Sequence, residues 1–472
     1  MSAPESHRPA RRLSLEPGPT IDPFALAGAD GMVFRTGGQV RVGLGTGMVI
    51  DLPDGLASTG DVARATRLLA AVAVEDHPTG AGHRAGPAAV TAFGALPYDR
   101  GAPARLVVPE LLYAADPDGS EWVTVLSDHP ARFPATPDGV RSWLLDRSEG
   151  GSGTEPDEGP PAPPRIAPRT SDDAFRSMVA DALRSIDRGD LAKVVLARQV
   201  DVAMPSPIVI PDLLRRWHRL EPNCAVFSLP APGGRFVGAS PELLVERLGT
   251  AVTSRPLAGT AGRHPGIGEG RRSTHLLRSP KDGNEHRLVV EAIEEALAPL
   301  CTDLEVPPGP DLVHLHTITH LGTTLVGTLA AGGDGTVPSA LQLVAALHPT
   351  PAVGGAPRSA ADQLIARLEP EPRGQYAGPV GMVDGAGNGT WMVGIRSMTV
   401  RGEEARLAAG VGIVAGSDPD AELAETNLKL RSVFEALAPG AAFSTADATS
   451  VARSGGLWAG PGRESGRSRA VG

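Results

Sequence analysis

The chain has 472 residues, which is enough for one large domain or two to three average ones, each with a sizeable buried core. Its formal net charge of -10 argues against a nucleic acid or an anionic membrane held by bulk electrostatics, so an anionic ligand needs a local cluster of cations. Only two cysteines occur, without metal-ligand spacing, and no signal peptide or membrane-length apolar run is evident, so we expect a cytoplasmic protein without zinc or disulfides.

Low-complexity segments predict the limits of the folded part. Residues 1–20 and 441–472 are rich in Gly, Ser, Pro and Arg, with little apolar periodicity, and we expect both to be disordered. A similar segment at 148–170 separates an N-terminal part, 21–147, from a C-terminal body, 171–440. This segment could link two domains or form a surface loop within one. Strand-like runs such as GMVI, RLVV and WVTVL indicate sheet in the N-terminal part, which shows no cluster of reactive groups.

The C-terminal body begins with an amphipathic helix that Gly189 ends, followed by the predicted strand KVVLARQV. That strand opens on Lys193, a charge where an apolar residue is expected. Glu242 follows the turn GASP, after which LLVE resumes a strand. A lysine and a glutamate at strand ends could act as base and acid across a small ligand, although either alone is more often a surface residue.

A second helix is predicted over residues 282–300, and its apolar stripe includes the position of Glu285. A buried carboxylate must be protonated or meet a cation, because burying it unpaired costs several kcal/mol. Alternatively, the first turn is frayed and Glu285 only favours the helix dipole. The spacing leaves both interpretations open.

A third helix is predicted over residues 419–438, with Asp418 as N-cap and Pro419 at the first helical position. Glu422, Glu425 and Lys429 share one face. A Mg²⁺ ion would relieve the repulsion between the two carboxylates, and Glu285 could approach it from the second helix. The alternative is a solvated face with an ordinary Glu425–Lys429 pair.

The run AAGVGIVAGSD leads through Gly410, Gly412 and Gly416 from a predicted strand to the third helix. It could offer backbone N–H groups to an anion at the helix N-terminus, or the glycines could allow strand and helix to pack closely. A dinucleotide site is disfavoured because the spacing is GxGxxxG without an acidic ribose partner. Together with the predicted strands of GTWMVGIRSMTV, these helices indicate an α+β or mixed α/β body.

Nine ordered segments resemble the chorismate-utilising enzymes, and within that family the isochorismate synthases. The segments lie in family order between residues 193 and 430. They are KVVLAR (193–198), GASPELLVER (238–247), SRPLAGTAGR (254–263), KDGNEHRLVV (281–290), THLGTTLVG (319–327), HPTPAVGG (348–355), YAGPVGMVD (376–384), GIRSMTV (394–400) and AGVGIVAGSDPDAELAETNLKL (409–430).

The resemblance implies that Lys193 is the general base for water attack on C2 of chorismate and Glu242 the general acid that protonates the departing C4 hydroxyl. It implies Mg²⁺ on Glu285 and Glu425, with Glu422 bound through water. The remaining substrate-binding residues that it implies are Gly259, Thr260, His320, Ala352, Tyr376, Arg396, Gly410 and Lys429.

The family fold that the resemblance implies is α+β, a single large domain of two interleaved, mainly antiparallel sheets flanked by helices. In that fold residues 148–170 are a Pro/Gly-rich surface loop. The resemblance also implies a monomer whose partner is the small molecule chorismate. From the charge and the lack of a long apolar run we expect no nucleic acid or membrane partner, and we expect no glutamine amidotransferase subunit, since neither Cys224 nor Cys301 lies in a GxCxG turn.

Alternatives within the family are separated by single positions. Anthranilate synthases carry glutamine where this chain has Lys193, and aminodeoxychorismate synthases carry a nucleophilic lysine where it has Ala258. Salicylate synthase, which also expels pyruvate, keeps both Lys193 and Glu242 and stays the nearest alternative. A non-catalytic chorismate-binding relative would be expected to lose the acid, the base or the metal ligands, all of which are present. The product could feed a siderophore or menaquinone.

Overall fold

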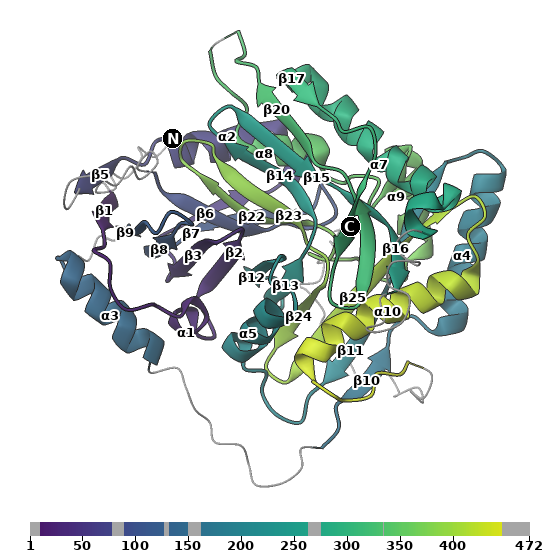
Figure 1. Ribbon diagram of the computed structural model, residues 1–472, viewed down its shortest axis with the longest axis horizontal. Helices are drawn as coiled ribbons and strands as arrows, with labels where there is room; N and C mark the ends of the chain where they lie inside the picture. The colour runs from purple at the N-terminus through teal and green to yellow at the C-terminus, as the bar shows by residue number, and fades with distance from the viewer. Residues whose placement is uncertain are drawn as a thin grey trace, which may run out of the picture.

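The structure is a computed structural model that describes residues 10–77, 89–126, 132–149, 162–262, 275–333 and 335–445. Two large sheets and one small sheet form the centre of the molecule, and helices lie on the outside of the sheets (Figure 1). Nearly all strand pairs are antiparallel, which confirms the expected α+β class with mainly antiparallel sheets. Within the described ranges, no helix is both long enough and apolar enough to span a membrane.

Among the described residues the largest sheet has thirteen strands, and there only β1 and β5 pair in parallel. In spatial order its strands are β10 (Arg165–Pro168), β11 (Lys193–Ala203), β25 (Glu404–Val414), β24 (Ser397–Arg401), β13 (Gly234–Ser240), β12 (Ala225–Ala231), β2 (Met32–Thr36), β3 (Gln39–Leu44), β8 (Leu111–Ala115), β9 (Glu121–Val125), β1 (Ala10–Ser14) and β5 (Val74–His77), with β21 (Gly355–Ala356) on β11. The predicted strand that begins at Lys193 is therefore confirmed, and it pairs along its whole length with β25.

The other two sheets have nine and three strands. The nine are β17 (Cys301–Glu305), β20 (Leu325–Leu329), β15 (Ala251–Arg255), β14 (Leu243–Leu248), β23 (Gly389–Val393), β22 (Pro379–Asp384), β6 (Thr91–Ala95), β7 (Ala104–Val108) and β4 (Met48–Leu52). The three are β16 (Leu257–Gly262), β19 (Ile318–Gly322) and β18 (Asp311–His314).

The N-terminal and C-terminal parts of the chain share both large sheets. In one sheet β2 pairs with β12, and in the other β6 pairs with β22. Each pairing joins a strand from before residue 148 to one from after residue 170. The two parts are therefore interleaved in a single body, and the alternative of two linked domains is wrong.

Helices cover the sheets with their apolar faces. They are α1 (Pro23–Ala27), α2 (Thr59–Ala70), α3 (Pro137–Glu149), α4 (Asp172–Asp187), α5 (Ile210–Leu220), α7 (Pro280–Leu297), α8 (Ala340–Leu347), α9 (Arg358–Leu368) and α10 (Pro419–Leu437), with 3-10 turns η1 (Gly55–Ala57) and η3 (Ala298–Leu300). The three helices expected in the C-terminal body are α4, α7 and α10. Asp418 caps α10 as predicted, because its carboxylate accepts from the backbone N–H groups of Asp420 and Ala421.

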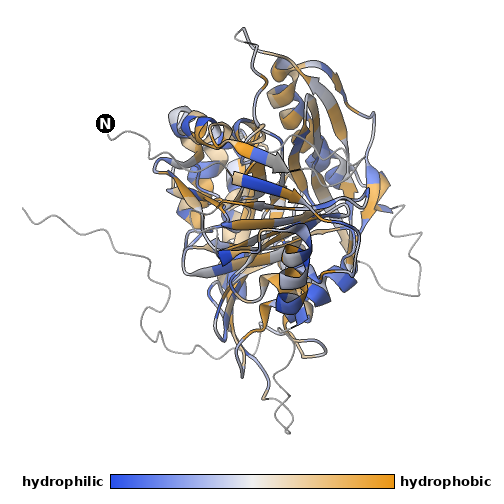
Figure 2. Cartoon of the chain, turned by 90° about the vertical axis from the view of Figure 1, so that its left-hand side faces the viewer, coloured by the Kyte–Doolittle hydropathy of each residue, from blue (hydrophilic) through white to orange (hydrophobic). Residues whose placement is uncertain are grey.

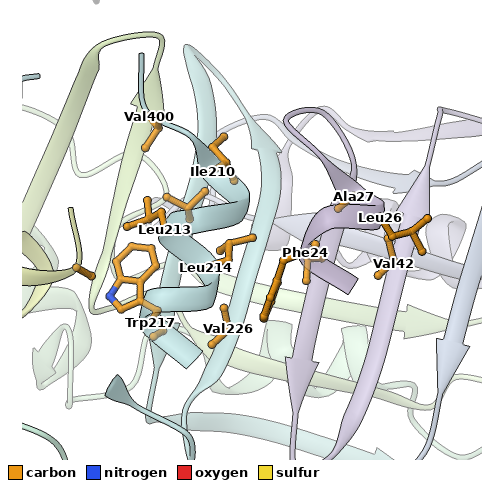
Figure 3. Close-up of a cluster of buried hydrophobic side chains, with 14 of the residues drawn as sticks. Phe24, Leu26, Ala27, Val42, Ile210, Leu213, Leu214, Trp217, Val226 and Val400 are labelled. Carbon is orange, nitrogen blue, oxygen red and sulfur yellow. The ribbon is translucent and has the colours of Figure 1, made fainter. Parts of the chain in front are cut away.

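The hydrophobic core joins elements that lie far apart in the sequence. Figure 3 shows Phe24 of α1 near Leu214 of α5 and Val226 of β12, with Trp217 on the other side of α5, and all four are buried. Figure 2 shows orange, hydrophobic stretches along many strands inside the molecule, as expected for strands that are buried along most of their length, such as β11. Burial of large side chains from both parts of the chain stabilises them as one unit.

The expected disordered N-terminus is wrong from Ala10 onward. Residues Ala10–Ser14 form β1 between β9 and β5. Leu13 is buried in the core, and the Arg12 guanidinium lies 4.5 Å from the ring centroid of Trp122. Because Arg12 stacks on an aromatic ring, it can be buried within a strand. In the sequence, the arginines of this segment had indicated a polar, disordered tail. Residues 1–9 lie outside the described residues.

The predicted surface loop and the predicted tail are also shorter than expected. Helix α3 continues to Glu149, and Arg165–Pro168 form strand β10 at the edge of the thirteen-stranded sheet, so 148–170 is not loop throughout. Residues 441–445 belong to the described structure, and the Phe443 ring packs on Phe434 with 5.1 Å between centroids. Residues 150–161 and 446–472 lie outside the described residues.

Candidate active site

A cavity lies where the sheets meet α7 and α10. It is lined by eleven of the thirteen residues proposed from the sequence, which are Glu242, Gly259, Thr260, Glu285, His320, Ala352, Tyr376, Arg396, Gly410, Glu425 and Lys429. The other two, Lys193 and Glu422, do not line the cavity themselves. Each forms an ion pair beside it, Lys193 with the lining residue Glu285 and Glu422 with Lys281.

Lys193 opens β11 and is fully buried. Its ammonium Nζ lies 3.1 Å from Oε1 of Glu285, which comes from α7. Helix α7 is capped by Ser279, whose hydroxyl accepts from the N–H of Asp282, so its first turn is formed. The frayed-turn interpretation of Glu285 is therefore wrong, and the buried lysine and the helix carboxylate neutralise each other.

Gly412 makes this ion pair possible. It lies in β25 opposite Val195 of the neighbouring strand β11. A Cβ atom at Gly412 would lie 2.2 Å from Oε1 of Glu285 and 3.0 Å from Cε of Lys193. The absence of a side chain therefore leaves space for both charged groups, which come from α7 and β11 and not from the helix α10 that follows Gly412.

The alternative of an anion site at the N-terminus of α10 is not supported. Gly410 and Gly412 lie within β25, which ends at Val414, before α10 begins at Pro419. Of the three glycines, only Gly416, with φ +84°, lies in the turn that connects the strand to the helix. The Asp418 carboxylate already accepts from the first N–H groups of α10. Gly410 contributes to the cavity from the middle of a strand.

Glu242 lies in the turn between β13 and β14 and is only 3% exposed. Burial raises the pKa of its carboxyl group to about 7, while a backbone hydrogen bond at Leu257 and the charges of Lys193, Arg396 and Lys429 act in the opposite direction. The carboxyl group can therefore hold a proton near neutral pH, which is the property that a general acid needs.

His320 and Arg396 form a hydrogen-bonded unit at the cavity wall. The Nδ1 atom of His320 lies 2.9 Å from the carbonyl oxygen of Gly259, which can only accept, so Nδ1 carries the proton. Nε2 is then free to accept from Nη2 of Arg396 at 2.9 Å. Burial, followed by the charges of Arg396 and Lys429, lowers the pKa of His320 to about 3 and keeps the ring neutral.

Backbone strain accompanies this wall of the cavity. Arg396 has φ +51° and Ala377 has φ +62°, and they are the only residues other than glycine with positive φ among the described residues. Both line the cavity. Such strain costs on the order of 1–3 kcal/mol per residue and concentrates at functional sites. Here it places the Arg396 side chain against His320.

Helix α10 presents two carboxylates and an ammonium to the interior. Glu422 is only 2% exposed, so the alternative that this face of α10 is solvated is wrong. The Glu425–Lys429 pair, which that alternative also predicted, is present. Lys429 Nζ lies 2.6 Å from Oε1 of Glu425 and donates to the carbonyl oxygen of Gly410 at 2.9 Å. Lys281 Nζ of α7 donates to Oε1 of Glu422 at 2.6 Å.

The carboxylates Glu285, Glu422 and Glu425, which we call the glutamate cluster, each pair with a lysine. Burial raises the pKa of Glu422 and the charge of Glu425 adds to this, against the hydrogen bond from Lys281. Burial lowers the pKa of Lys281, but the hydrogen bond and charge of Glu422, and then the charges of Glu285 and Glu425, outweigh it, so the pKa is raised. All three carboxylates thus act on one ammonium group.

The donor set of the glutamate cluster fits a hard divalent cation, because Mg²⁺ prefers a few carboxylate oxygens and retains water. In the described ranges, however, no three Asp, Glu, His or Cys side chains surround a common point. Their carboxylates are directed to lysines instead. The Mg²⁺ ligands Glu285, Glu422 and Glu425 therefore stay a prediction.

Arg373 and Lys281 are site residues that the sequence interpretation missed. Arg373 lines the cavity and donates to the carbonyl oxygens of Val195 and Val353 at 2.8 and 2.7 Å. Its neighbours EPEPRGQYAG have no periodicity, so no local signal indicated that it is buried. Lys281 did carry a signal, because lysine is rare in this chain.

Comparison with known proteins shows which family this chain resembles. The family model described as "Chorismate binding enzyme" matches residues 139–438. Isochorismate synthase DhbC of Bacillus subtilis is 41% identical over 282 residues, which cover 58% of this chain and 69% of that protein. The vibriobactin-specific isochorismate synthase of Vibrio cholerae is 34% identical over 346 residues, or 73% of this chain and 78% of that protein.

The fold agrees as well. The solved structure of DhbC from Bacillus anthracis has a TM-score of 0.69 to this chain at 30% identity, and the match covers 87% of this chain and 96% of that one. The family model covers more than half of the chain, and it includes both α10 and the strand that opens on Lys193. The chain therefore belongs to the chorismate-binding enzyme family.

Proposed function

We propose that this chain is an isochorismate synthase that isomerises chorismate by adding water at C2 and releasing the C4 hydroxyl. Two relatives that it matches over more than two thirds of their length are named isochorismate synthases. The observation that carries the proposal is the buried Glu242 carboxyl group, whose pKa of about 7 suits a general acid, in one cavity with a buried lysine at its border.

In the proposed mechanism, Lys193 as a neutral amine takes a proton from the water that attacks C2. Glu242 gives its proton to the C4 oxygen, which leaves as water, so the substrate and product have the same composition. The Glu285 carboxylate, whose Oε1 lies 3.1 Å from Nζ of Lys193, fixes the position of this amine at the border of the cavity. Both groups must then exchange protons with solvent before the next turnover.

Substrate carboxylates need cations in this net-acidic chain. Arg396 and Lys429 are the cations that line the cavity near His320 and Gly410, and we propose that they bind one carboxylate. Glu285, Glu422 and Glu425 would hold Mg²⁺, which when bound supplies positive charge to the second carboxylate. The neutral His320 holds Arg396 in place without adding charge of its own.

The test is incubation of the purified protein with chorismate and Mg²⁺, with and without ammonium, followed by chromatographic separation of products. We expect isochorismate as the main product. Salicylate with pyruvate would instead assign a salicylate synthase, anthranilate would assign an ammonia-using enzyme, and binding without turnover would assign a non-catalytic relative. Lys193→Ala should abolish turnover while it leaves Mg²⁺-dependent chorismate binding largely intact.

A further inference from the structure

Lysine is almost absent from this chain. Only three of its 44 lysine and arginine residues are lysines, at positions 193, 281 and 429. All three lie at the candidate site, and each pairs with a different member of the glutamate cluster. Wherever else the chain needs a cation it uses arginine. The amines of this chain are therefore concentrated at the candidate site, whereas its other fixed cations are guanidinium groups.

The proposed function gives roles to Lys193 and Lys429 but leaves Lys281 without one. Lysine differs from arginine in being a compact, strongly hydrated charge on a flexible stem, whereas the guanidinium of arginine is a planar fork suited to fixed pairs. An arginine could hold Glu422 in a permanent ion pair. A lysine is the better choice where the cation has to leave.

Exposure distinguishes Lys281 from the other two lysines. The side chain of Lys281 is 36% exposed, against 0% for Lys193 and 11% for Lys429. Its ammonium thus has a way to solvent, while its partner Glu422 is only 2% exposed. A carboxylate buried to this degree needs either a proton or a cation, and a divalent cation that binds Glu422 as a carboxylate would take the place of the ammonium.

We propose that Lys281 is a displaceable internal cation, which neutralises the glutamate cluster in the metal-free protein and withdraws to solvent when a divalent cation binds the same carboxylates. Resting on the proposed function, this inference adds a positioning residue for its metal site. It explains why no three carboxylates surround a common point among the described residues, since Lys281 draws Glu422 toward itself.

The first test measures Mg²⁺ binding by calorimetry without substrate, in the full chain and in Lys281→Met. Loss of a competing, partly exposed ion pair should tighten Mg²⁺ binding by about five- to tenfold. A matched control is Arg176→Met, because Arg176 is 40% exposed and pairs with Asp420 in the same first turn of α10. The control removes an equal charge and should leave Mg²⁺ affinity unchanged.

A Lys281→Met variant that binds Mg²⁺ with unchanged or weaker affinity overturns the inference, and so does an equal tightening in Arg176→Met. The first outcome would show that Lys281 is a fixed structural partner of Glu422. The second would show that Mg²⁺ affinity depends only on the net charge of the protein. Lys281→Arg, which keeps the charge, should bind Mg²⁺ no more tightly than the wild type.

The second test uses the wild-type chain and does not depend on the folding of any variant. Protein labelled with ¹³C at the lysine side chains gives signals from only three residues, and the spectrum of Lys281→Arg identifies the one from Lys281. Addition of Mg²⁺ should move that signal toward the position of a solvated lysine. If the Lys281 signal keeps its position when Mg²⁺ binds, the ammonium does not withdraw and the inference fails.

Turnover of chorismate in the same preparations separates the two proposals. Isochorismate formation by a wild-type protein whose Lys281 signal does not respond to bound Mg²⁺ refutes the displaceable cation only. Displacement of Lys281 by Mg²⁺ in a protein that makes no isochorismate refutes the proposed reaction only. A wild-type chain that converts chorismate but binds no Mg²⁺ refutes both the inference and the metal part of the mechanism.

Discussion

At the scale of single residues, Glu242 links activity to pH. Burial raises its pKa to about 7, so the carboxyl group loses its proton as the pH rises through that value. A general acid must be protonated when substrate binds, and we therefore expect kcat/KM for chorismate to fall tenfold per pH unit above about pH 7. A pH profile that stays flat to about pH 9 would contradict this role.

The same carboxyl group affects stability. Its pKa is about 7 in the folded chain against a reference of 4.5, so between these values the folded state binds more protons and the unfolding free energy falls as pH rises. Glu242→Gln removes this cost. We expect the variant to be about 3 kcal/mol more stable than the wild type at about pH 8, with the gain vanishing toward the reference pKa, as measured by urea unfolding. An equal gain at both ends would contradict the assignment.

Gly412 tests the packing of the Lys193–Glu285 pair. In Gly412→Ala the new methyl group would lie 2.2 Å from Oε1 of Glu285, which is the end of a flexible side chain and can move aside. We therefore expect the fold to persist while chorismate turnover falls by about tenfold or more, because a small misplacement of a site group is costly. Thermal unfolding checks the fold, and a variant with normal turnover would show that Glu285 needs no fixed position.

At the scale of elements, the sequence predicted those helices and strands whose formation depends on nearby residues, such as apolar periodicity and helix caps. Helices α4 and α10 have apolar stripes and capping residues, and β11 has the apolar segment VVLA directly after Lys193 and contains further valines, so each was predicted close to its observed bounds. Strands β1 and β10 were missed because their stability comes from pairing with distant strands. For the same reason, no spacing rule could place Lys193 against Glu285, which lies on another element 92 positions later.

Helix α7 offers a control for the glycine variant. Gly283 lies in its first half with exposed surroundings, and a Cβ atom there would meet nothing within 4 Å. Replacing a helical glycine by alanine stabilises a helix by about 1 kcal/mol. Gly283→Ala should therefore raise the unfolding free energy by about this amount without loss of chorismate turnover. Destabilisation would show that the α7 backbone needs the freedom of glycine near Glu285.

At the scale of the whole molecule, the two parts of the chain complete each other's sheets. The C-terminal body holds the predicted site residues, but it is not a separate unit, because β12 and β22 each pair with a strand of the N-terminal part. This agrees with the single large domain expected from the sequence. Phe24 of α1 also packs in the core that contains Trp217 of α5 (Figure 3). The N-terminal part therefore contributes stability to the site without lining the cavity.

This interleaving predicts how fragments behave. A fragment of residues 171–445 would leave the edges of β12 and β22 unpaired and expose apolar side chains such as Phe227 and Val380, which are fully buried in the intact chain. Exposed strand edges of this kind promote aggregation. We expect the fragment alone to be insoluble or without a cooperative thermal transition, and co-expression with residues 10–149 to restore a soluble complex that converts chorismate. A fragment that folds cooperatively alone would show that the site region is an independent domain, because its sheets would then not need the N-terminal strands.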